Sequence, residues 1–342
     1  MSDWTGRITV GGKLMLAGEY SVLSPSGMAV AVAVSPGLSV HVSDSEEWGL
    51  EREDLGIRWQ LSDGPPPAPL LFAATGVLAV LKRFEQSACR PGTIRFEPVT
   101  AYGSGNEKPG VGGSASATVA AMAGVYQRLG KSINTEEFIN LAITVHREAQ
   151  GGRGSGYDVA TISHGGLVEY QPRSLDAGKP VDVRSRRIPW PKGLQLIAGY
   201  TGHSASTTKL LQRLEACQEA DATGTARAMS LLGQPVPALV DALRSGRFEQ
   251  IVAAVSRCQH ALESFDAALG IGIMTPQVSD MLVQATSVGA ACKVSGAGGG
   301  DSVVALVPDE AVRRAVEAVW NNAGFRVLPV ELSFDSPFGA AQ

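Results

Sequence analysis

A run of small side chains at residues 109–119, Pro-Gly-Val-Gly-Gly-Ser-Ala-Ser-Ala-Thr-Val, leads directly into the apolar segment Ala120–Leu129. The first turn of a helix leaves backbone N–H groups unpaired and carries the positive end of the helix dipole. Glycines at that point let phosphate oxygens approach the main chain. The run therefore predicts an anion-binding loop at the start of a helix, and a tight loop before a buried helix is the alternative.

Two common nucleotide motifs do not fit this loop. Gly110-x-Gly112-x-x-Ala115 satisfies the dinucleotide fingerprint formally, but that fingerprint requires a strand leading into its first glycine. Here residues 102–109 read YGSGNEKP, which is a polar loop. The Walker A motif needs Gly-x-x-x-x-Gly-Lys-Ser/Thr, and no Gly-Lys pair in the chain meets it. The loop is expected to belong to another family of phosphate-binding sites.

Composition bounds the class of protein. With 342 residues, 44% of them hydrophobic, the chain is long enough for two domains. A net charge of −4 gives no electrostatic footprint for nucleic acid. The N-terminus lacks a basic region followed by an apolar stretch, and no apolar run reaches the roughly 20 residues of a membrane span. Widely spaced cysteines predict reduced thiols and a cytoplasmic protein without membrane contact; these are Cys89, Cys217, Cys258 and Cys292.

The first half of the chain alternates strands and helices without a regular βαβ pattern. Strands are expected at residues 7–10, 13–17, 28–34, 38–42, 93–96 and 166–170, and helices at residues 70–84 and after Asn134, which precedes Glu137 by three residues as in a capping box. A second glycine-rich turn follows at Gly151–Asp158. The polar, proline-bearing stretch Gln171–Pro191 is expected to hold the division between a domain at residues 1–185 and one at residues 186–342.

The second half predicts strands at 195–200, 291–295, 302–307 and 326–332, and helices near 209–221, 237–245, 248–269, 276–287 and 310–321. A third glycine-rich loop, Ser295–Asp301, leads into a strand rather than a helix. Its expected role is close packing of backbone beside a ligand. The mixture of elements in both halves predicts an α+β fold.

Four segments in this order resemble the GHMP kinase superfamily: Gly12-Lys13-Leu14 with Gly18-Glu19-Tyr20, the loop Pro109–Thr118, Gly154–Ala160 (GSGYDVA), and Lys293–Asp301 (KVSGAGGGD). The resemblance implies a two-domain α+β fold. In it, an N-terminal domain of the ribosomal-protein-S5-like domain 2 type and a C-terminal ferredoxin-like α/β sandwich place an active site in the cleft between them. It also implies ATP as co-substrate and Mg²⁺ as cofactor.

Within the superfamily the chain looks most like the phosphomevalonate kinases. The motifs that carry this likeness are Ala17–Tyr20, the GSGYDVA segment, Ala198–Gly202 with Ser206–Thr208, and the loop after Ser295. The resemblance implies transfer of the ATP γ-phosphoryl group to the 5-phosphate of mevalonate 5-phosphate, in isoprenoid synthesis. Mevalonate kinase or another small-molecule GHMP kinase is one alternative, and a non-catalytic binding protein of the same fold is another. A nicotinamide dehydrogenase is disfavoured by the polar stretch before Gly110.

The resemblance assigns ATP binding to the first glycine loop, namely Pro109, Gly110, Val111, Gly112, Gly113, Ser114, Ala115 and Ser116. Ser114 would reach a phosphate or Mg²⁺, although a helix N-cap is an equal alternative. Glu148 roughly matches a Mg²⁺ ligand, against the simpler role of an exposed helix-end residue. Two departures from the family pattern are Gly11, where proline is usual, and Gly113, where a serine is usual.

Lys13 and Asp158 are the predicted catalytic residues. An ammonium between two phosphates lowers their repulsion most at the transition state. Because a phosphate acceptor has a second pKa of about 6, Asp158 is expected to orient Lys13 or the metal, with base catalysis secondary. Without the resemblance, a solvated lysine and a turn-capping aspartate are the default interpretations.

The substrate-binding residues that the resemblance implies lie on four segments. They are Lys13, Glu19, Tyr20, Ser155, Gly156, Ser206, Thr207, Thr208, Ser295, Gly296, Ala297 and Gly298.

Overall fold

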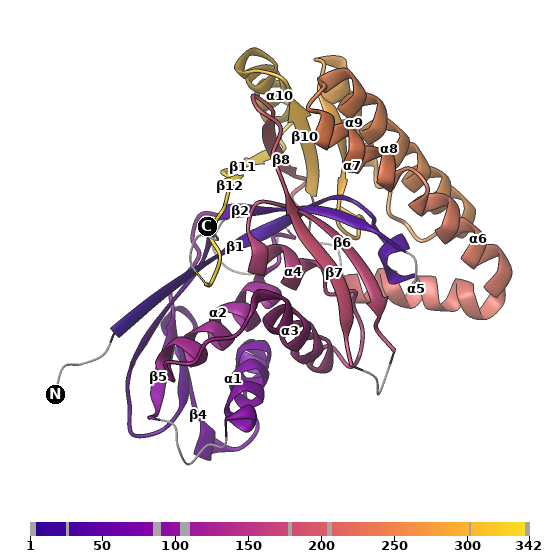
Figure 1. Cartoon of the computed structure of the whole chain (residues 1–342). Coiled ribbons are helices and arrows are strands. Elements are labelled where there is room, and N and C mark those ends of the chain that lie inside the picture. Colours follow the sequence, from indigo (N-terminus) through magenta and orange to yellow (C-terminus); the bar gives the residue numbers. More distant parts are fainter. Residues whose placement is uncertain are drawn as a thin grey trace.

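The computed structural model describes residues 5–24, 27–84, 90–102, 110–176, 180–203, 207–300 and 302–338. Its N-terminal part is built on a large, mostly antiparallel sheet (Figure 1). The sheet has the order β4-β3-β5-β2-β6-β7, and β1 and β12 also pair with β2. The strands are β1 (Thr5–Ala17), β2 (Ala29–Asp44), β3 (Gly49–Arg52), β4 (Ile57–Gln60), β5 (Gly92–Phe96), β6 (Leu167–Ser174), β7 (Asp182–Ile188) and β12 (Glu331–Leu332).

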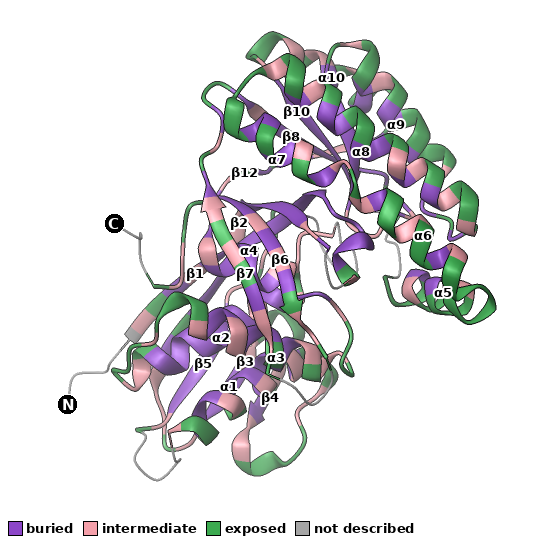
Figure 2. Cartoon of the chain, turned by 45° about the vertical axis from the view of Figure 1, so that its right-hand side comes forward, coloured by how far each residue is buried: buried purple, intermediate pink, exposed green. Residues whose placement is uncertain are grey.

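Helices α1 (Leu71–Arg83), α2 (Gly113–Arg128), α3 (Thr135–Ala149) and α4 (Tyr157–His164) pack together over this sheet. Their apolar residues and those of the strands form one buried core, which includes Val10, Ile94, Met122 and Phe138. Figure 2 shows the buried colour running along the inner faces of these helices and strands. The core fixes the start of α2 and the start of α4 close to β1, because both helices contact that strand.

The C-terminal part is a four-stranded antiparallel sheet of order β11-β8-β10-β9. Its strands are β8 (Gln195–Tyr200), β9 (Ala291–Ser295), β10 (Ser302–Val307) and β11 (Arg326–Leu328). The helices are α5 (Thr207–Ala220), α6 (Ala222–Gly233), α7 (Val236–Ser245), α8 (Phe248–Leu269), α9 (Pro276–Ser287) and α10 (Glu310–Asn322).

Alternation along β8 and β10 sends side chains to two cores. Ile197 and Ala305 pack in a core with α9 and α10, whereas Leu196 and Leu306 pack in a core with α7 and the first half of α8. The second of these cores also contains Leu14 of β1 and neighbouring residues of β2. The two parts of the molecule therefore share a packed interior along β1 and β2.

The α+β prediction is confirmed, and α8, α9, β9 and β10 have the predicted bounds. Asn134 caps α3, as its spacing from Glu137 predicts, and Thr275 caps α9. The structure adds β3, β4, α4, α6 and β7, which the sequence did not indicate. Strand β7 spans the division that was expected after residue 185, and β12 returns to the N-terminal sheet.

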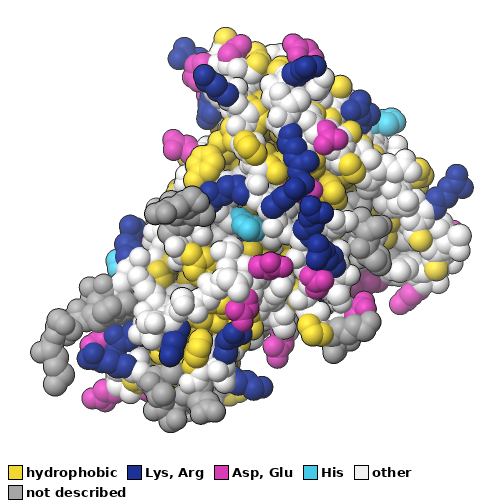
Figure 3. Space-filling view, viewed as in Figure 1, with side chains coloured by type: hydrophobic (Ala, Val, Ile, Leu, Met, Phe, Trp, Pro, Cys, Tyr) yellow, Lys and Arg dark blue, Asp and Glu magenta, His cyan; other side chains and the backbone are white. Residues whose placement is uncertain are grey.

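Strand β7, within the polar stretch where the division was expected, is an edge strand of the N-terminal sheet. Arg186 pairs with Glu169 of β6, and Arg244 of α7 reaches the same carboxylate. Arg187 donates to the carbonyl oxygens of His164 and Gly165. Lysine and arginine side chains gather in a band down this face of the molecule (Figure 3). Salt bridges and backbone acceptors account for these arginines.

Cys217, Cys258 and Cys292 are free thiols, and Cys89 lies outside the described residues. Among the described helices none combines the length and apolar character needed to cross a bilayer.

Candidate active site

The first glycine loop packs against β1 so closely that neither backbone has room for a side chain at the contact. Lys13 N donates to Val111 O at 2.8 Å. A Cβ on Gly12 would lie 2.7 Å from Val111 O, and one on Gly112 would lie 2.9 Å from the Lys13 Cγ. Gly112 also has φ +87°, which glycine adopts at little cost. These glycines therefore allow the loop to seat against the strand that carries Lys13.

Helix α2 begins immediately after this contact, with Gly112 as its N-cap and no side-chain cap hydrogen bond. The first described intrahelical bond is from Ser116 N to Gly112 O, so the backbone N–H groups of residues 113–115 lie ahead of the hydrogen-bonded ladder. Ser114 is therefore inside the first turn rather than at the N-cap. This is the geometry of a helix N-terminus available to an anion.

Lys13 lies at the mouth of this loop. Its side chain is largely buried, with 9% of the residue exposed, and Nζ donates to Gly110 O at 2.6 Å. Nζ also lies 5.6 Å from the centre of the Tyr157 ring, which is within the range of a cation–π contact. A buried ammonium is rare in a protein without such partners. The solvated-lysine alternative therefore does not describe this residue.

Asp158 lies in the first turn of α4, next to Tyr157 in the sequence. Gly156 caps the helix with φ +83°, and a Cβ there would lie 2.5 Å from Ile143 Cγ2, so glycine brings α4 against α3. Asp158 Oδ1 accepts from Val159 N at 2.9 Å. Burial raises the pKa of Tyr157, and the charges of Lys13 and Asp158 act on it in opposite directions. The charges of the two predicted catalytic residues thus both act on the Tyr157 side chain.

Ser114 has a partner that the sequence did not indicate. His146 Nε2 lies 3.2 Å from Ser114 Oγ, and the imidazole ring packs on Phe72 with centroids 5.1 Å apart. His146 is 2% exposed. The only sequence signal for it is its position on the inward face of an amphipathic helix, which is a weak one.

Glu148 lies two positions further along the same helix and is exposed. Successive helix residues are about 100° apart, so two residues rotate a side chain to nearly the opposite face. The structure therefore brings His146, and not Glu148, to Ser114. Ser116 is also turned away from the loop mouth, since its Oγ donates to Gly11 O at 3.0 Å.

The third glycine loop approaches the same strand from the C-terminal part. Ser295 Oγ accepts from Met15 N at 2.9 Å, where the pairing of β1 with β2 shifts register. Tyr20 OH donates to Ala297 O at 2.5 Å. Tyr20 has φ +55°, an uncommon backbone conformation for a residue with a side chain. Burial raises the pKa of Tyr20, so it remains a neutral donor.

Glu19 forms a buried ion pair with Lys293 of β9. The two residues are 4% and 1% exposed. This pair, the Ser295 contact and the Tyr20 contact join the two parts of the molecule within seven residues of Lys13. Glu19 therefore contributes to the contact between the two parts through its buried ion pair with Lys293.

The remaining predicted residues divide into three groups. Ser155 is buried beside α4, and its carbonyl accepts from Tyr170 OH. Thr207 and Thr208 are exposed at the start of α5. Pro109, Ser206 and Asp301 lie outside the described residues.

No group of three or more histidine, cysteine, aspartate or glutamate side chains in the described ranges is arranged to hold a metal ion. Mg²⁺ commonly takes one or two protein oxygens, several waters and the substrate phosphates. The Ser114 hydroxyl and the Asp158 carboxylate are oxygen donors at the starts of α2 and α4. Each of them is the kind of oxygen ligand that Mg²⁺ prefers, and a nucleotide would supply the remaining oxygens.

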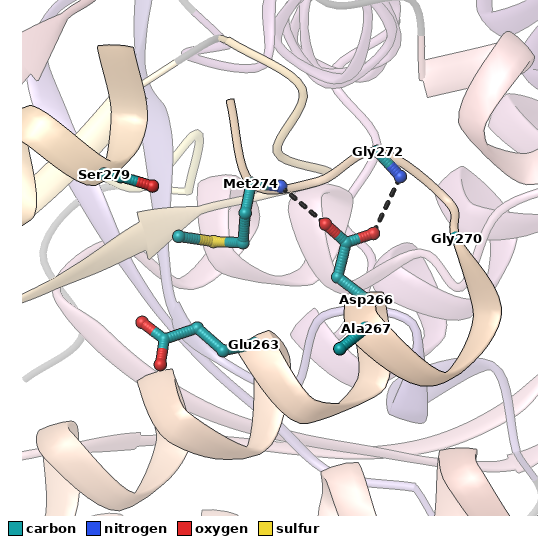
Figure 4. A pocket seen from close by; sticks show the side chains of 7 residues that line it. All are labelled: Glu263, Asp266, Ala267, Gly270, Gly272, Met274 and Ser279. Carbon is teal, nitrogen blue, oxygen red and sulfur yellow. Dashed lines mark hydrogen bonds between the residues drawn. The ribbon is translucent and has the colours of Figure 1, made fainter. Parts of the chain in front are cut away.

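An open pocket of about 420 Å³ lies elsewhere, between the end of α8 and the start of α9 (Figure 4). Its lining includes Glu263, Asp266 and Met274 but none of the predicted site residues. The candidate active site is instead defined by the three glycine loops that meet at β1.

Known proteins resemble this chain over nearly its whole length. The sequence models described as GHMP kinases N terminal domain and GHMP kinases C terminal match residues 76–166 and 239–325. A phosphomevalonate kinase of Streptomyces sp. (strain CL190) is 31% identical over 93% of this chain and 95% of that protein. A mevalonate kinase of Saccharolobus solfataricus is 24% identical over 87% of this chain and 89% of that protein.

Solved structures share the fold. The Streptococcus pneumoniae phosphomevalonate kinase in complex with phosphomevalonate and AMPPNP superposes with a TM-score of 0.80, at 20% identity over 96% of this chain and 99% of that one. The Lin0012 protein from Listeria innocua gives a TM-score of 0.87, at 22% identity over 96% of this chain and 98% of that one.

Fold and sequence together define a class of two-part α+β proteins whose members are ATP-dependent kinases. The chain belongs to the GHMP kinases.

Proposed function

We propose that this chain is a phosphomevalonate kinase, which transfers the ATP γ-phosphoryl group to the 5-phosphate of mevalonate 5-phosphate and releases ADP and mevalonate 5-diphosphate. The observation that carries the proposal is the place of Lys13 Nζ, buried against Gly110 O at the mouth of the α2 loop. The 31% identical Streptomyces relative, named as a phosphomevalonate kinase, supports the choice of acceptor.

The α2 loop would hold the β- and γ-phosphates of ATP. Backbone N–H groups of residues 113–115 and the positive end of the helix dipole favour the bound anion. The Ser114 hydroxyl, positioned by His146 at 3.2 Å, would bind a phosphate oxygen or the metal. Mg²⁺ would neutralise charge on the phosphate oxygens, with Ser114 and Asp158 as its protein ligands.

Lys13 would act between the donor and acceptor phosphates. Phosphoryl transfer asks the protein chiefly to align the two groups and to offset the charge between them. A fixed ammonium does so most strongly when the two groups are closest, and hence raises kcat more than ATP affinity.

Asp158 would position rather than remove a proton. A phosphate monoester loses its second proton with a pKa of about 6, so the acceptor oxygen is already ionised near neutral pH. A hydroxyl acceptor would need a base, and Asp158, whose charge acts on Tyr157 in the direction opposite to that of Lys13, would be the candidate. The pH–rate profile of Asp158→Asn separates these roles, since loss of an acidic limb present in the wild type indicates a base.

The acceptor would lie along the third glycine loop, Gly296–Gly298, and would contact Lys13 and Tyr20. The exposed hydroxyls of Thr207 and Thr208 at the start of α5, with Ser206, would bind its existing phosphate. We place this reaction in the cytoplasm, as the composition predicts, with ATP and the small-molecule acceptor as partners and no nucleic acid or membrane.

Mevalonate kinase is the second candidate, because relatives of that name match 87% or more of this chain at 23–28% identity. The two candidates differ in one group on the acceptor, a phosphate against a hydroxyl. A non-catalytic protein of the same fold would bind ATP without turnover.

A coupled ADP-release assay with mevalonate, mevalonate 5-phosphate, galactose and homoserine tests the proposal. We expect turnover with mevalonate 5-phosphate at least about tenfold above the other acceptors in kcat/KM, which corresponds to about 1.4 kcal/mol. Lys13→Met is the matched control. At an effective dielectric constant of about 20, one charge at about 4 Å contributes roughly 4 kcal/mol, so kcat should fall by about 10³ with ATP affinity little changed.

Preferred turnover of mevalonate overturns the choice of acceptor. Absence of ADP release with every acceptor supports the non-catalytic alternative. A Lys13→Met variant that changes only KM contradicts the role given to the ammonium.

A further inference from the structure

The third glycine loop has no side chains of its own that could fix its backbone conformation. Residues 296–300 contain four glycines, and all four have φ between +74° and +120°. Glycine loses more backbone entropy on ordering than any other residue, and the loop carries no large side chain that could anchor it. Contacts from elsewhere must therefore fix the direction of its amides.

Tyr20 and Thr201 donate to the carbonyl oxygens of Ala297 and Gly300. The backbone contact to the middle of the loop comes from the segment 270–274, which connects α8 to α9. Gly299 N donates to Ile273 O at 2.8 Å. A Cβ on Gly298 would lie 2.3 Å from Ile273 Cγ2, so the two backbones are as close as glycine permits. Ile273 is fully buried, and hence the segment presents a fixed surface to the loop.

The segment 270–274 has no regular secondary structure of its own. Asp266, in the last turn of α8, accepts from Gly272 N at 2.7 Å through Oδ1 and from Met274 N at 2.8 Å through Oδ2 (Figure 4). Arg213 of α5 donates to Ile271 O at 2.6 Å. The two carboxylate oxygens thus bracket Ile273, the residue whose carbonyl receives the loop amide.

We infer that Asp266 is a positioning residue for the third glycine loop, acting through the segment 270–274. Hydrogen bonds to an ionised carboxylate are about twice as strong as neutral ones, so one side chain can fix two amides of an otherwise irregular segment. The orientation of the loop follows from this anchoring, whatever binds there. Its consequence for acceptor binding rests on the proposed function.

Glu263 supplies a matched control. It lies one turn earlier on α8 and lines the same pocket, but it accepts from Gln259 Nε2 at 3.0 Å and does not bond the segment 270–274. Glu263→Gln removes a charge of the same sign from the same helix face. Any effect that Asp266→Asn shares with Glu263→Gln is therefore not specific to the two bonds from Asp266 to the segment 270–274.

Hydrogen exchange on the full chain tests the inference without any substrate. In Asp266→Asn the amides of residues 296–300 and 270–274 should exchange about tenfold faster, the factor that the loss of one charge-assisted hydrogen bond corresponds to. Strand β10 and helix α10 should keep wild-type rates, and Glu263→Gln should leave all four regions unchanged. Steady-state kinetics should then show a roughly tenfold higher KM for mevalonate 5-phosphate with an unchanged KM for ATP.

Unchanged exchange of residues 296–300 overturns the inference, and so does an equal increase in β10, which would mark a general loss of stability. If Asp266→Asn does not fold, Arg213→Gln replaces it, since Arg213 is exposed and bonds the same segment. Faster exchange of the loop in a chain that phosphorylates no acceptor upholds the inference and refutes the proposed function.

Discussion

Removal of one charge from the buried pair of Glu19 and Lys293 should destabilise the protein strongly. The side chains are 3% and 1% exposed, and Lys293 Nζ has Val294 O as its second acceptor. In Glu19→Gln the ammonium remains buried with neutral oxygens as its partners. Loss of one partner of a buried ion pair costs about 3–5 kcal/mol. This is a large part of a total stability of roughly 5–15 kcal/mol.

Two further variants separate the pair from its surroundings. Glu19→Gln combined with Lys293→Met removes both charges, and it should cost less than the single variants Glu19→Gln and Lys293→Met together because no buried ion is left unpaired. Arg314→Gln is the exposed control, since Arg314 and Glu310 form an i, i+4 pair with side chains 76% and 56% exposed. Such a pair contributes about 0.3–0.5 kcal/mol.

Urea unfolding at pH 7 gives the free energy of unfolding for each variant. A loss below about 1 kcal/mol in Glu19→Gln, or a double variant whose loss is the sum of the two single losses, would refute the reasoning. If Glu19 instead binds the acceptor directly, Glu19→Gln should raise the acceptor KM while the unfolding midpoint stays at the wild-type value.

Three other predictions follow from the site and its supports. Gly113→Ser should raise the unfolding free energy by a few tenths of a kcal/mol and keep the KM for ATP within about twofold, because its Cβ meets no atom within 4 Å and glycine disfavours helix; a larger rise in KM refutes this. His146→Phe and Ser114→Ala should each lower kcat/KM for ATP by about tenfold, and together by little more, since the two side chains act as one unit; additive losses would contradict that coupling. Burial lowers the pKa of His164 to about 4, so the unfolded chain binds more protons as pH falls from about 6.5 towards 4. The wild type should therefore lose roughly 2 kcal/mol more stability between pH 7.5 and 4.5 than His164→Gln, as measured by urea unfolding, and equal losses would exclude His164 as the cause.

Periodicity and capping predicted the long elements because they carry strong local signals. Helix α8 and strands β9 and β10 pack on buried faces, and their apolar spacing is close to ideal. Strand β7 escaped the same reasoning because it is an edge strand. Only Val183 and Ile188 of β7 are buried, and its arginines face outward. Nothing in such a pattern distinguishes a strand from a solvated linker.

The anion-binding character of the first glycine loop was predicted from its own residues, and the resemblance to the GHMP kinases supplied the other residues of the candidate site. Glycines at points of close backbone approach are visible in the sequence. Gly12 and Gly112 are examples, because any Cβ there would collide with the opposite segment. The side-chain partners within the site were not visible in the sequence in this way. His146, rather than Glu148, reaches Ser114 because of helix phase, and Asp266 acts through backbone amides whose sequence is unremarkable.

Phosphorus NMR of the product tests the central claim most directly. The purified chain is incubated with ATP, Mg²⁺ and mevalonate 5-phosphate, with Lys13→Met as the control. The account predicts a pair of coupled diphosphate signals from a new P–O–P linkage, formed together with ADP and absent from the Lys13→Met sample. Inorganic phosphate and ADP without a new diphosphate, or a phosphorylated product only when mevalonate replaces its 5-phosphate, would contradict it.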